Sequence, residues 1–158
     1  MRLYSGFLAG LFLLAALFAP MHHAQIHQPM SDSYILIDKS ENKLTYYYYK
    51  QPIRTFKVAT GANPADTPNG VFEVVMMVKN PWYLKKNIPG GDPDNPLGVR
   101  WIGIEVPGTD GSKYGIHGTN RPDSIGNHVS AGCVRMTNGD VSWLYDRVKV
   151  GTLVEIVD

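Results

Sequence analysis

The chain has 158 residues, of which 44% are hydrophobic and 18% are charged, a composition typical of a single folded globular domain. Fifteen Lys and Arg residues against fourteen Asp and Glu residues give a net charge of +1, and no basic stripe runs along the sequence. Because nucleic-acid binding depends on clustered cations, these values argue against a nucleic-acid partner.

The N-terminal residues have the pattern of a targeting segment. Arg2 supplies a positive charge, and an uncharged apolar run of thirteen residues follows at 7–19. That length suits a signal peptide better than a membrane span, which needs about 20 residues. We therefore expect export to the periplasm or cell envelope, with residues 1–24 as a signal peptide or membrane anchor and 25–31 as a short exit segment. Cleavage and N-terminal membrane attachment are both left open.

Three strands are predicted after the exit segment, at residues 34–38, 44–50 and 53–60. They are rich in aromatic and β-branched residues or alternate between apolar and polar residues, and turn-forming residues separate them. We expect them to form a meander with one face buried. The four consecutive tyrosines at 46–49 are expected to pack half inward and half outward, rather than to form a platform for sugars.

Turn-forming residues dominate 61–70, and a strand is predicted at 71–78. A long loop rich in Pro, Gly and Asn follows at 80–97. Loops of this length in a compact domain are often functional, so the loop is either a lid over a site or a surface insertion. Further strands are predicted at 98–106 and 114–117.

One helix is predicted near the C-terminus. Thr137 and Asp140 have the spacing of a capping box, and Gly151 marks the end of the helix. The apolar residues between them recur at helical spacing: Val141, Leu144, Tyr145 and Val148. A final strand follows Gly151. Residues 32–158 are therefore expected to form one mainly β domain, sandwich-like or barrel-like, with one packed α-helix.

The residues that could carry chemistry lie between 114 and 138. His117 ends a predicted strand, and the only cysteine of the chain, Cys133, follows sixteen residues later behind Gly132. A thiol is mostly protonated at neutral pH, but a neighbouring imidazole can take its proton, and the imidazolium then favours the thiolate. The backbone N–H groups of Gly132 and Cys133 could stabilise an oxyanion. A buried structural cysteine and a structural histidine are the alternatives at this point.

No metal site and no cofactor are expected. A zinc site built from His117, His128 and Cys133 would lack a fourth ligand and a familiar spacing. We interpret His128 as a loop histidine. The other histidines lie in the targeting region or the exit segment: His22, His23 and His27.

The segments IHGTN at 116–120 and SAGCVRM at 130–136 resemble the signature of the L,D-transpeptidase catalytic domain, the YkuD-like family. In that family a His-Gly pair is followed by a serine, a Gly-Cys pair and an arginine. Other landmarks occur in the same order, and the similarity extends from about residue 34 to 157: TG at 60–61, TPNG at 67–70, LGVRWI at 97–102 and N-x-D at 138–140. Many relatives have a second histidine where this chain has Ala131, which leaves His117 as the base.

The resemblance implies a role for six residues. Cys133 matches the nucleophile, His117 the general base, and Gly118 the residue whose backbone carbonyl orients the imidazole. The remaining matches line and shape the pocket: Ser130, Gly132 and Arg135. The guanidinium of Arg135 suits a substrate carboxylate, and a structural ion pair is its alternative role.

The function that the resemblance implies is that of an exported, cysteine-dependent acyltransferase acting on peptidoglycan stem peptides. The thiolate of Cys133 would attack the carbonyl of the third stem residue and release D-alanine. An amine of a neighbouring stem would then resolve the thioester and cross-link the wall. The alternatives are an L,D-carboxypeptidase, in which water resolves the thioester, and a non-catalytic wall-binding module. The resemblance also implies acylation by carbapenem antibiotics.

Overall fold

The structure is a computed structural model that describes residues 32–158. The predicted targeting segment at 1–24 and the exit segment at 25–31 lie outside the described residues. Within residues 32–158, no helix is both long enough and apolar enough to cross a membrane.

Between residues 32 and 158 the chain forms ten strands, one α-helix and two short 3-10 helices. The strands are β1 (Ser33–Asp38), β2 (Lys43–Tyr48), β3 (Gln51–Lys57), β4 (Thr60–Gly61), β5 (Gly70–Lys79), β6 (Arg100–Ile104), β7 (Gly115–His117), β8 (His128–Ser130), β9 (Val134–Arg135) and β10 (Leu153–Val157). The helices are α1 (Asn138–Tyr145) and the 3-10 segments η1 (Leu84–Lys86) and η2 (Pro122–Ser124).

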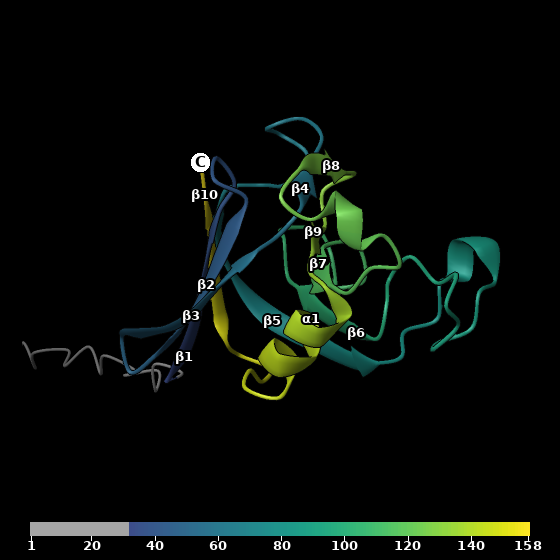
Figure 1. Cartoon of the computed structure of the whole chain (residues 1–158). Helices are drawn as coiled ribbons and strands as arrows, with labels where there is room; N and C mark the ends of the chain where they lie inside the picture. The colour runs from purple at the N-terminus through teal and green to yellow at the C-terminus, as the bar shows by residue number, and fades with distance from the viewer. Residues whose placement is uncertain (1–31) are drawn as a thin grey trace, which may run out of the picture.

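Eight strands form one sheet in the order β3-β2-β1-β10-β5-β6-β7-β9, and β4 pairs with β8 in a separate small sheet. The large sheet is curled, with β1, β2, β3 and β10 on one side and β6 and β7 on the other (Figure 1). Helix α1 packs against β6 and β7. The described domain is therefore mainly β with one packed α-helix, which confirms the predicted fold class.

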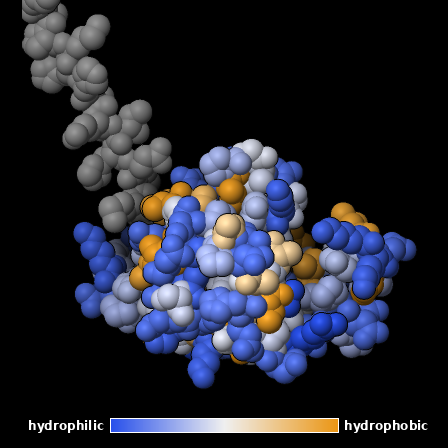
Figure 2. Space-filling model, turned by 90° about the horizontal axis from the view of Figure 1, so that it is seen from above, coloured by the Kyte–Doolittle hydropathy of each residue, from blue (hydrophilic) through white to orange (hydrophobic). Residues whose placement is uncertain are grey.

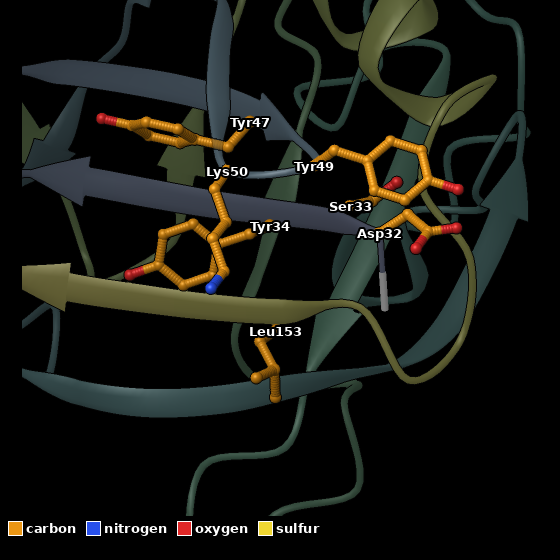
Figure 3. Close-up of a pocket in the computed structure, with 7 residues that line it drawn as sticks. All are labelled: Asp32, Ser33, Tyr34, Tyr47, Tyr49, Lys50 and Leu153. Carbon is orange, nitrogen blue, oxygen red and sulfur yellow. The ribbon is translucent and has the colours of Figure 1, made fainter. Parts of the chain in front are cut away.

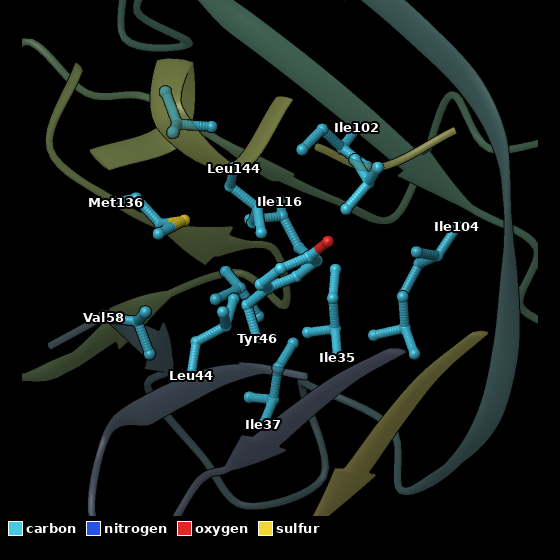
Figure 4. Packing of buried hydrophobic residues seen from close by; sticks show 14 of the residues in the cluster. Ile35, Ile37, Leu44, Tyr46, Val58, Ile102, Ile104, Ile116, Met136 and Leu144 are labelled. Atoms are coloured by element: carbon cyan, nitrogen blue, oxygen red, sulfur yellow. The ribbon is translucent and has the colours of Figure 1, made fainter. Parts of the chain in front are cut away.

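The hydrophobic core fills the inside of the curl. Strand residues point alternately to the two faces of a sheet, so every second residue of the central strands is buried. The inward hydrophobic residues of β1 and β10 are at most 1% exposed: Ile35, Ile37, Val154 and Ile156. Figure 4 shows isoleucines from different strands of the curled sheet, together with Leu144 of α1, meeting around the ring of Tyr46. This core fixes the register of the strands that carry the site.

The three N-terminal strands form the predicted antiparallel meander. The prediction of one buried face holds for β1 and β2 but is wrong for β3, in which Phe56 is the only buried residue. Ile53, for example, is 52% exposed. Because β3 is an edge strand of the large sheet, its first residues extend past the packed core into solvent.

Helix α1 begins where the sequence predicts. The Thr137 hydroxyl accepts the backbone N–H of Asp140 at 3.1 Å and so caps the helix. The predicted end is wrong, because the helix stops at Tyr145 with Asp146 as its C-cap. Val148 is buried but lies in the turn that leads to β10, so its spacing reflects core packing rather than a further helical turn.

The turn between β2 and β3 has an unusual composition. Tyr48 pairs with Gln51, so Tyr49 and Lys50 form a two-residue loop, and their φ angles are 46° and 64°. Such turns favour Asn-Gly, because residues with a Cβ atom are strained at positive φ by about 1–2 kcal/mol each. The sequence therefore places two large side chains where the backbone disfavours them.

Replacing this pair by the sequence that the turn favours, Tyr49→Asn with Lys50→Gly, should stabilise the domain. We expect the free energy of unfolding to rise by about 1 kcal/mol, because relief of strain exceeds the added freedom of glycine in the unfolded chain. Urea denaturation of the wild type and the double variant measures this change. Tyr49→Ala, which keeps the strain, is the control and should bring no gain. A double variant less stable than the wild type would contradict the assignment of strain.

The long loop at 80–97 forms a lobe that projects from one side of the domain (Figure 1). A bridge between Tyr83 and Ile88 closes its tip, which carries η1 and exposes Trp82 and Leu84. Seen from above, the lobe lies at the right of the molecule, with a recess between it and the body (Figure 2). Its role as a lid or as an insertion stays a prediction.

Candidate active site

The pairing of β7 with β9 brings the candidate residues onto one face of the sheet. The two strands are parallel, with Ile116 beside Val134 and His117 beside Arg135. Ile116 and Val134 are buried in the core. Because side chains alternate along a strand, His117 and Arg135 lie on the opposite face, as does Cys133, which directly precedes Val134.

The thiol of Cys133 lies at the edge of this face and is only partly buried. Its sulfhydryl group donates to the backbone carbonyl of Lys113 at 3.4 Å. The register of β7 and β9 places Cys133 beside Gly115, whose backbone N–H faces the sulfur. Backbone groups therefore hold the sulfur, and it is not part of the aliphatic core.

The hydrogen bonds of His117 fix its tautomer. Nδ1 lies 2.6 Å from the carbonyl oxygen of Gly118. A carbonyl can only accept, so Nδ1 carries the hydrogen and Nε2 keeps its lone pair. The ring is 4% exposed and stacks on Trp101 with centroids 5.5 Å apart, and the Trp101 indole donates to the Gly111 carbonyl. The neutral imidazole can thus accept a proton only at Nε2.

Burial sets the resting charges of the pair. It lowers the pKa of His117 to about 4, against the opposing hydrogen bond to the Gly118 carbonyl. Burial also raises the pKa of the Cys133 thiol, although the Gly115 N–H and the Arg135 cation act in the other direction. Both groups are therefore neutral near pH 7. The desolvation of both groups therefore outweighs the contacts that would favour an imidazolium–thiolate pair at rest.

Ser130 holds the loop that presents the cysteine. Its hydroxyl donates to the Cys133 carbonyl at 2.6 Å and accepts the Gly132 N–H at 3.0 Å. Ser130 therefore already engages the Gly132 N–H, and the role of that group at an oxyanion stays a prediction. The Cys133 N–H has no hydrogen-bond partner among residues 32–158 and stays the candidate donor. Gly132 has φ of +129°, and a Cβ atom there would lie 2.5 Å from the Asp66 carbonyl.

Thr67 also holds the cysteine loop, a role that the sequence analysis did not predict. The Thr67 hydroxyl donates to the Gly132 carbonyl and accepts the Gly61 N–H, both at 2.9 Å, and Thr67 is 1% exposed. The buried ammonium of Lys39 in turn donates to the carbonyls of Pro64 and Thr67 at 2.8 and 3.1 Å. The only signal in the sequence was the TPNG landmark, which gave Thr67 no role.

The variant Thr67→Val should loosen the cysteine loop. Valine keeps the shape but leaves the Gly132 carbonyl and the Gly61 N–H without partners, which destabilises the domain by about 1–3 kcal/mol. We expect the reaction of Cys133 with acylating reagents to slow about tenfold or more, because small displacements of a nucleophile reduce rates steeply. Intact-mass time courses on folded protein measure the rate. Thr67→Ser should restore it, and an unchanged rate and stability in Thr67→Val would contradict the assignment.

Asn138 fixes the backbone around Gly118. Its Oδ1 accepts the backbone N–H groups of Val99 and Thr119, both at 3.3 Å. A Cβ atom at Gly118 would lie 2.2 Å from this oxygen, so a larger residue there would displace the Asn138 amide. Thr137 caps the helix, so the Asn138 side chain is free to tie the entry of β6 to the exit of β7.

Arg135 lies half-buried on the face that carries His117 and Cys133. Among residues 32–158, no carboxylate forms a salt bridge with its guanidinium. Its charge and that of Lys85, from the projecting loop, both act to lower the pKa of the Cys133 thiol. The alternative of a structural ion pair is therefore not found, and the guanidinium is available to an anionic ligand.

His128 is engaged elsewhere. Its ring nitrogens lie 3.0 Å from the Thr60 hydroxyl and 3.1 Å from the Asn42 amide nitrogen, which anchors the small sheet of β4 and β8. The structure therefore does not join it to His117 in a ligand set. Within the part of the chain that the structure describes, no group of three or more His, Cys, Asp or Glu residues is arranged to hold a metal ion.

The chain is similar to known proteins over most of its length. The family model of the L,D-transpeptidase catalytic domain (YkuD) matches residues 32–156. YqjB of Bacillus subtilis (strain 168), named as an L,D-transpeptidase, is 43% identical over 152 residues, covering 96% of this chain and 85% of that protein. ErfK/SrfK of Escherichia coli (strain K12), also so named, is 35% identical, covering 78% of this chain and 44% of that protein.

A solved structure shares the fold. It is L,D-transpeptidase 3 from Mycobacterium tuberculosis in complex with a faropenem-derived adduct, with a TM-score of 0.64 and 18% identity. The match covers 80% of this chain and 60% of that chain. This chain therefore spans most of YqjB but less than two thirds of the other two proteins.

Proposed function

Because this chain belongs to the L,D-transpeptidase catalytic-domain family, we propose that it is an exported, cysteine-dependent acyltransferase that cross-links peptidoglycan stem peptides. One observation carries the proposal: Cys133, directly before β9, and His117 of β7 lie on the same face of the sheet, and the imidazole keeps a lone pair at Nε2. Export to the periplasm or cell envelope is supported by Arg2 and the apolar run at 7–19.

The first half of the reaction forms a thioester. As the sulfur of Cys133 attacks the carbonyl carbon of the third stem residue, its proton passes to Nε2 of His117. The proton transfer accompanies the attack, because both groups are neutral at rest. The N–H of Cys133 stabilises the developing oxyanion. The bond to D-alanine then breaks, and the imidazolium returns the proton to the departing amine.

The second half transfers the acyl group. The amine of a neighbouring stem attacks the thioester, neutral His117 takes one of its protons, and the sulfur leaves with that proton. The product is an amide bond between two stems, and the site returns to its starting state. If water attacks instead, the same steps give a tripeptide and an L,D-carboxypeptidase activity. The residues described here position the thioester and do not select between the two acceptors.

The proposal is tested by incubating the full chain with disaccharide tetrapeptides and analysing the products by mass spectrometry. We expect free D-alanine together with cross-linked dimers. D-alanine with tripeptide alone would assign the carboxypeptidase alternative. Tetrapeptides that bind but are not converted would contradict the enzyme and favour the wall-binding module.

Arg135 should bind a carboxylate of the stem. Its guanidinium has no salt-bridge partner within residues 32–158 and lies on the face of the thiol. We expect Arg135→Gln to lower kcat/KM about 10- to 100-fold, mainly through KM, because a hydrogen-bonded charge contributes about 1.5–3 kcal/mol. Steady-state release of D-alanine measures the effect. Arg135→Lys should retain part of the affinity. Unchanged kinetics in Arg135→Gln would return Arg135 to a structural role.

A further inference from the structure

A cavity of about 620 Å³ lies on the outer surface of the sheet, away from Cys133. Figure 3 shows its lining, which comes from β1, β2, the β2–β3 turn and β10: Asp32, Ser33, Tyr34, Tyr47, Tyr49, Lys50 and Leu153. Its volume is in the range of small-molecule binding sites, which is about 300–1,000 Å³. In the sheet order β1 and β7 are four strand steps apart, or about 19 Å along the sheet.

The lining has the chemistry of a site for an uncharged ligand with both apolar and polar faces. Three tyrosines and a leucine supply most of it, and Tyr34 meets Tyr47 edge to face with centroids 5.7 Å apart. Tyrosine combines a flat apolar ring with a hydroxyl. One carboxylate, Asp32, and one ammonium, Lys50, balance each other in charge. A polyanion or a strongly cationic ligand is therefore disfavoured.

The strained turn provides a second observation. Tyr49 and Lys50 both have positive φ, where Asn-Gly would relieve the strain, and both line the cavity. In Figure 3 the Tyr49 ring lies beside Asp32 and Ser33, while the Lys50 side chain extends toward Tyr34. Strained residues cluster at ligand-binding positions because their side chains are needed there. The strain is explained if these side chains contact a ligand.

We propose that this cavity binds the glycan part of peptidoglycan, an N-acetylated saccharide whose C–H faces stack on the tyrosines and whose hydroxyl and amide groups meet Asp32 and Lys50. The inference rests on the proposed function for the identity of the polymer, but not on the chemistry of the thiol. It revises the expectation that the tyrosines at 46–49 serve packing alone: Tyr46 is in the core, whereas Tyr47 and Tyr49 line the cavity.

The test is an NMR or calorimetric titration of the full chain with the tetramer of N-acetylglucosamine. We expect saturable binding by the wild type and equal binding by Cys133→Ala. Tyr49→Asn with Lys50→Gly should bind at least about tenfold more weakly, as should Tyr47→Ala, because they remove side chains that line the cavity. The double variant is expected to be more stable than the wild type, so its weaker binding would not reflect unfolding.

Three results would overturn the proposal. The first is the absence of saturable binding, and the second is equal binding by the double variant. The third is a dimer in solution that the double variant disrupts without any saccharide binding, which would assign the cavity to a second copy of the chain. Failure of the proposed function is distinguishable, since it would appear as loss of D-alanine release while the saccharide still binds.

Discussion

Replacing Cys133 with alanine is expected to abolish the release of D-alanine from tetrapeptide stems. The substitution removes the atom that forms the thioester, and loss of a covalent nucleophile lowers kcat by about 10⁴-fold or more. No other cysteine is present in the sequence to take over. Product analysis by mass spectrometry measures the loss directly.

Cys133→Ala is also the control for a simpler experiment, the acylation of the thiol by an antibiotic. Intact-mass analysis after exposure to a carbapenem or to faropenem should show one adduct on the wild type and none on Cys133→Ala. The faropenem-derived adduct belongs to a protein that shares the fold at 18% identity, so its occurrence here is a prediction. An equal adduct on both forms of the protein would place the acylated residue elsewhere and contradict the nucleophile assignment.

The second large effect is expected for His117→Gln. Glutamine is neutral and can still donate to the Gly118 carbonyl, but it cannot take the proton of the thiol. The rate should therefore fall about 10²- to 10⁴-fold. His128→Gln is the matched control, because His128 lies in the same segment but bonds to Thr60 and Asn42. Equal losses in the two variants would indicate general damage to the fold rather than removal of a base.

His117→Gln also gives a readout that does not depend on turnover. Burial lowers the pKa of His117 from its ordinary 6.5 to about 4, so between these values the unfolded chain binds a proton that the folded domain excludes. The contribution of neutral His117 to the free energy of unfolding is present above pH 6.5 and is lost as the pH falls toward 4. It amounts to about 3 kcal/mol. Urea denaturation at pH 7 and 4.5 should show a smaller acid-induced loss in His117→Gln than in the wild type.

The sequence predicted the long elements of the fold because their residues follow a clear periodicity. The alternation in β1, β2 and β10 and the Thr137 cap of α1 gave the meander, the last strand and the start of the helix. The strands β8 and β9 have three and two residues, too few to show a period. Their partners lie far along the chain, so the pairing of β7 with β9 could not be inferred from local pattern.

The candidate site was predicted in its residue types but not in its electrostatics or its supports. Nearby groups suggested a thiolate, whereas burial favours the neutral thiol, and burial depends on the whole fold. Ser130 bonds to the Gly132 N–H, and Thr67 bonds to the Gly132 carbonyl. Both bonds depend on how the loop folds, which a local sequence pattern does not show. The burial of the Lys39 ammonium could not be predicted, because its carbonyl partners come from residues 64 and 67, on another turn.

The proposed mechanism requires a thiol that is neutral at rest and passes its proton to a neutral imidazole as it attacks. The most direct measurement is the rate of acylation of wild-type Cys133 by faropenem between pH 4 and 8, followed by intact mass. We predict a rate that is flat through neutral pH and falls only near pH 4, where His117 gains a proton. A rate that rises tenfold with each pH unit and is equal in His117→Gln would contradict it, because the thiolate would then form without the imidazole.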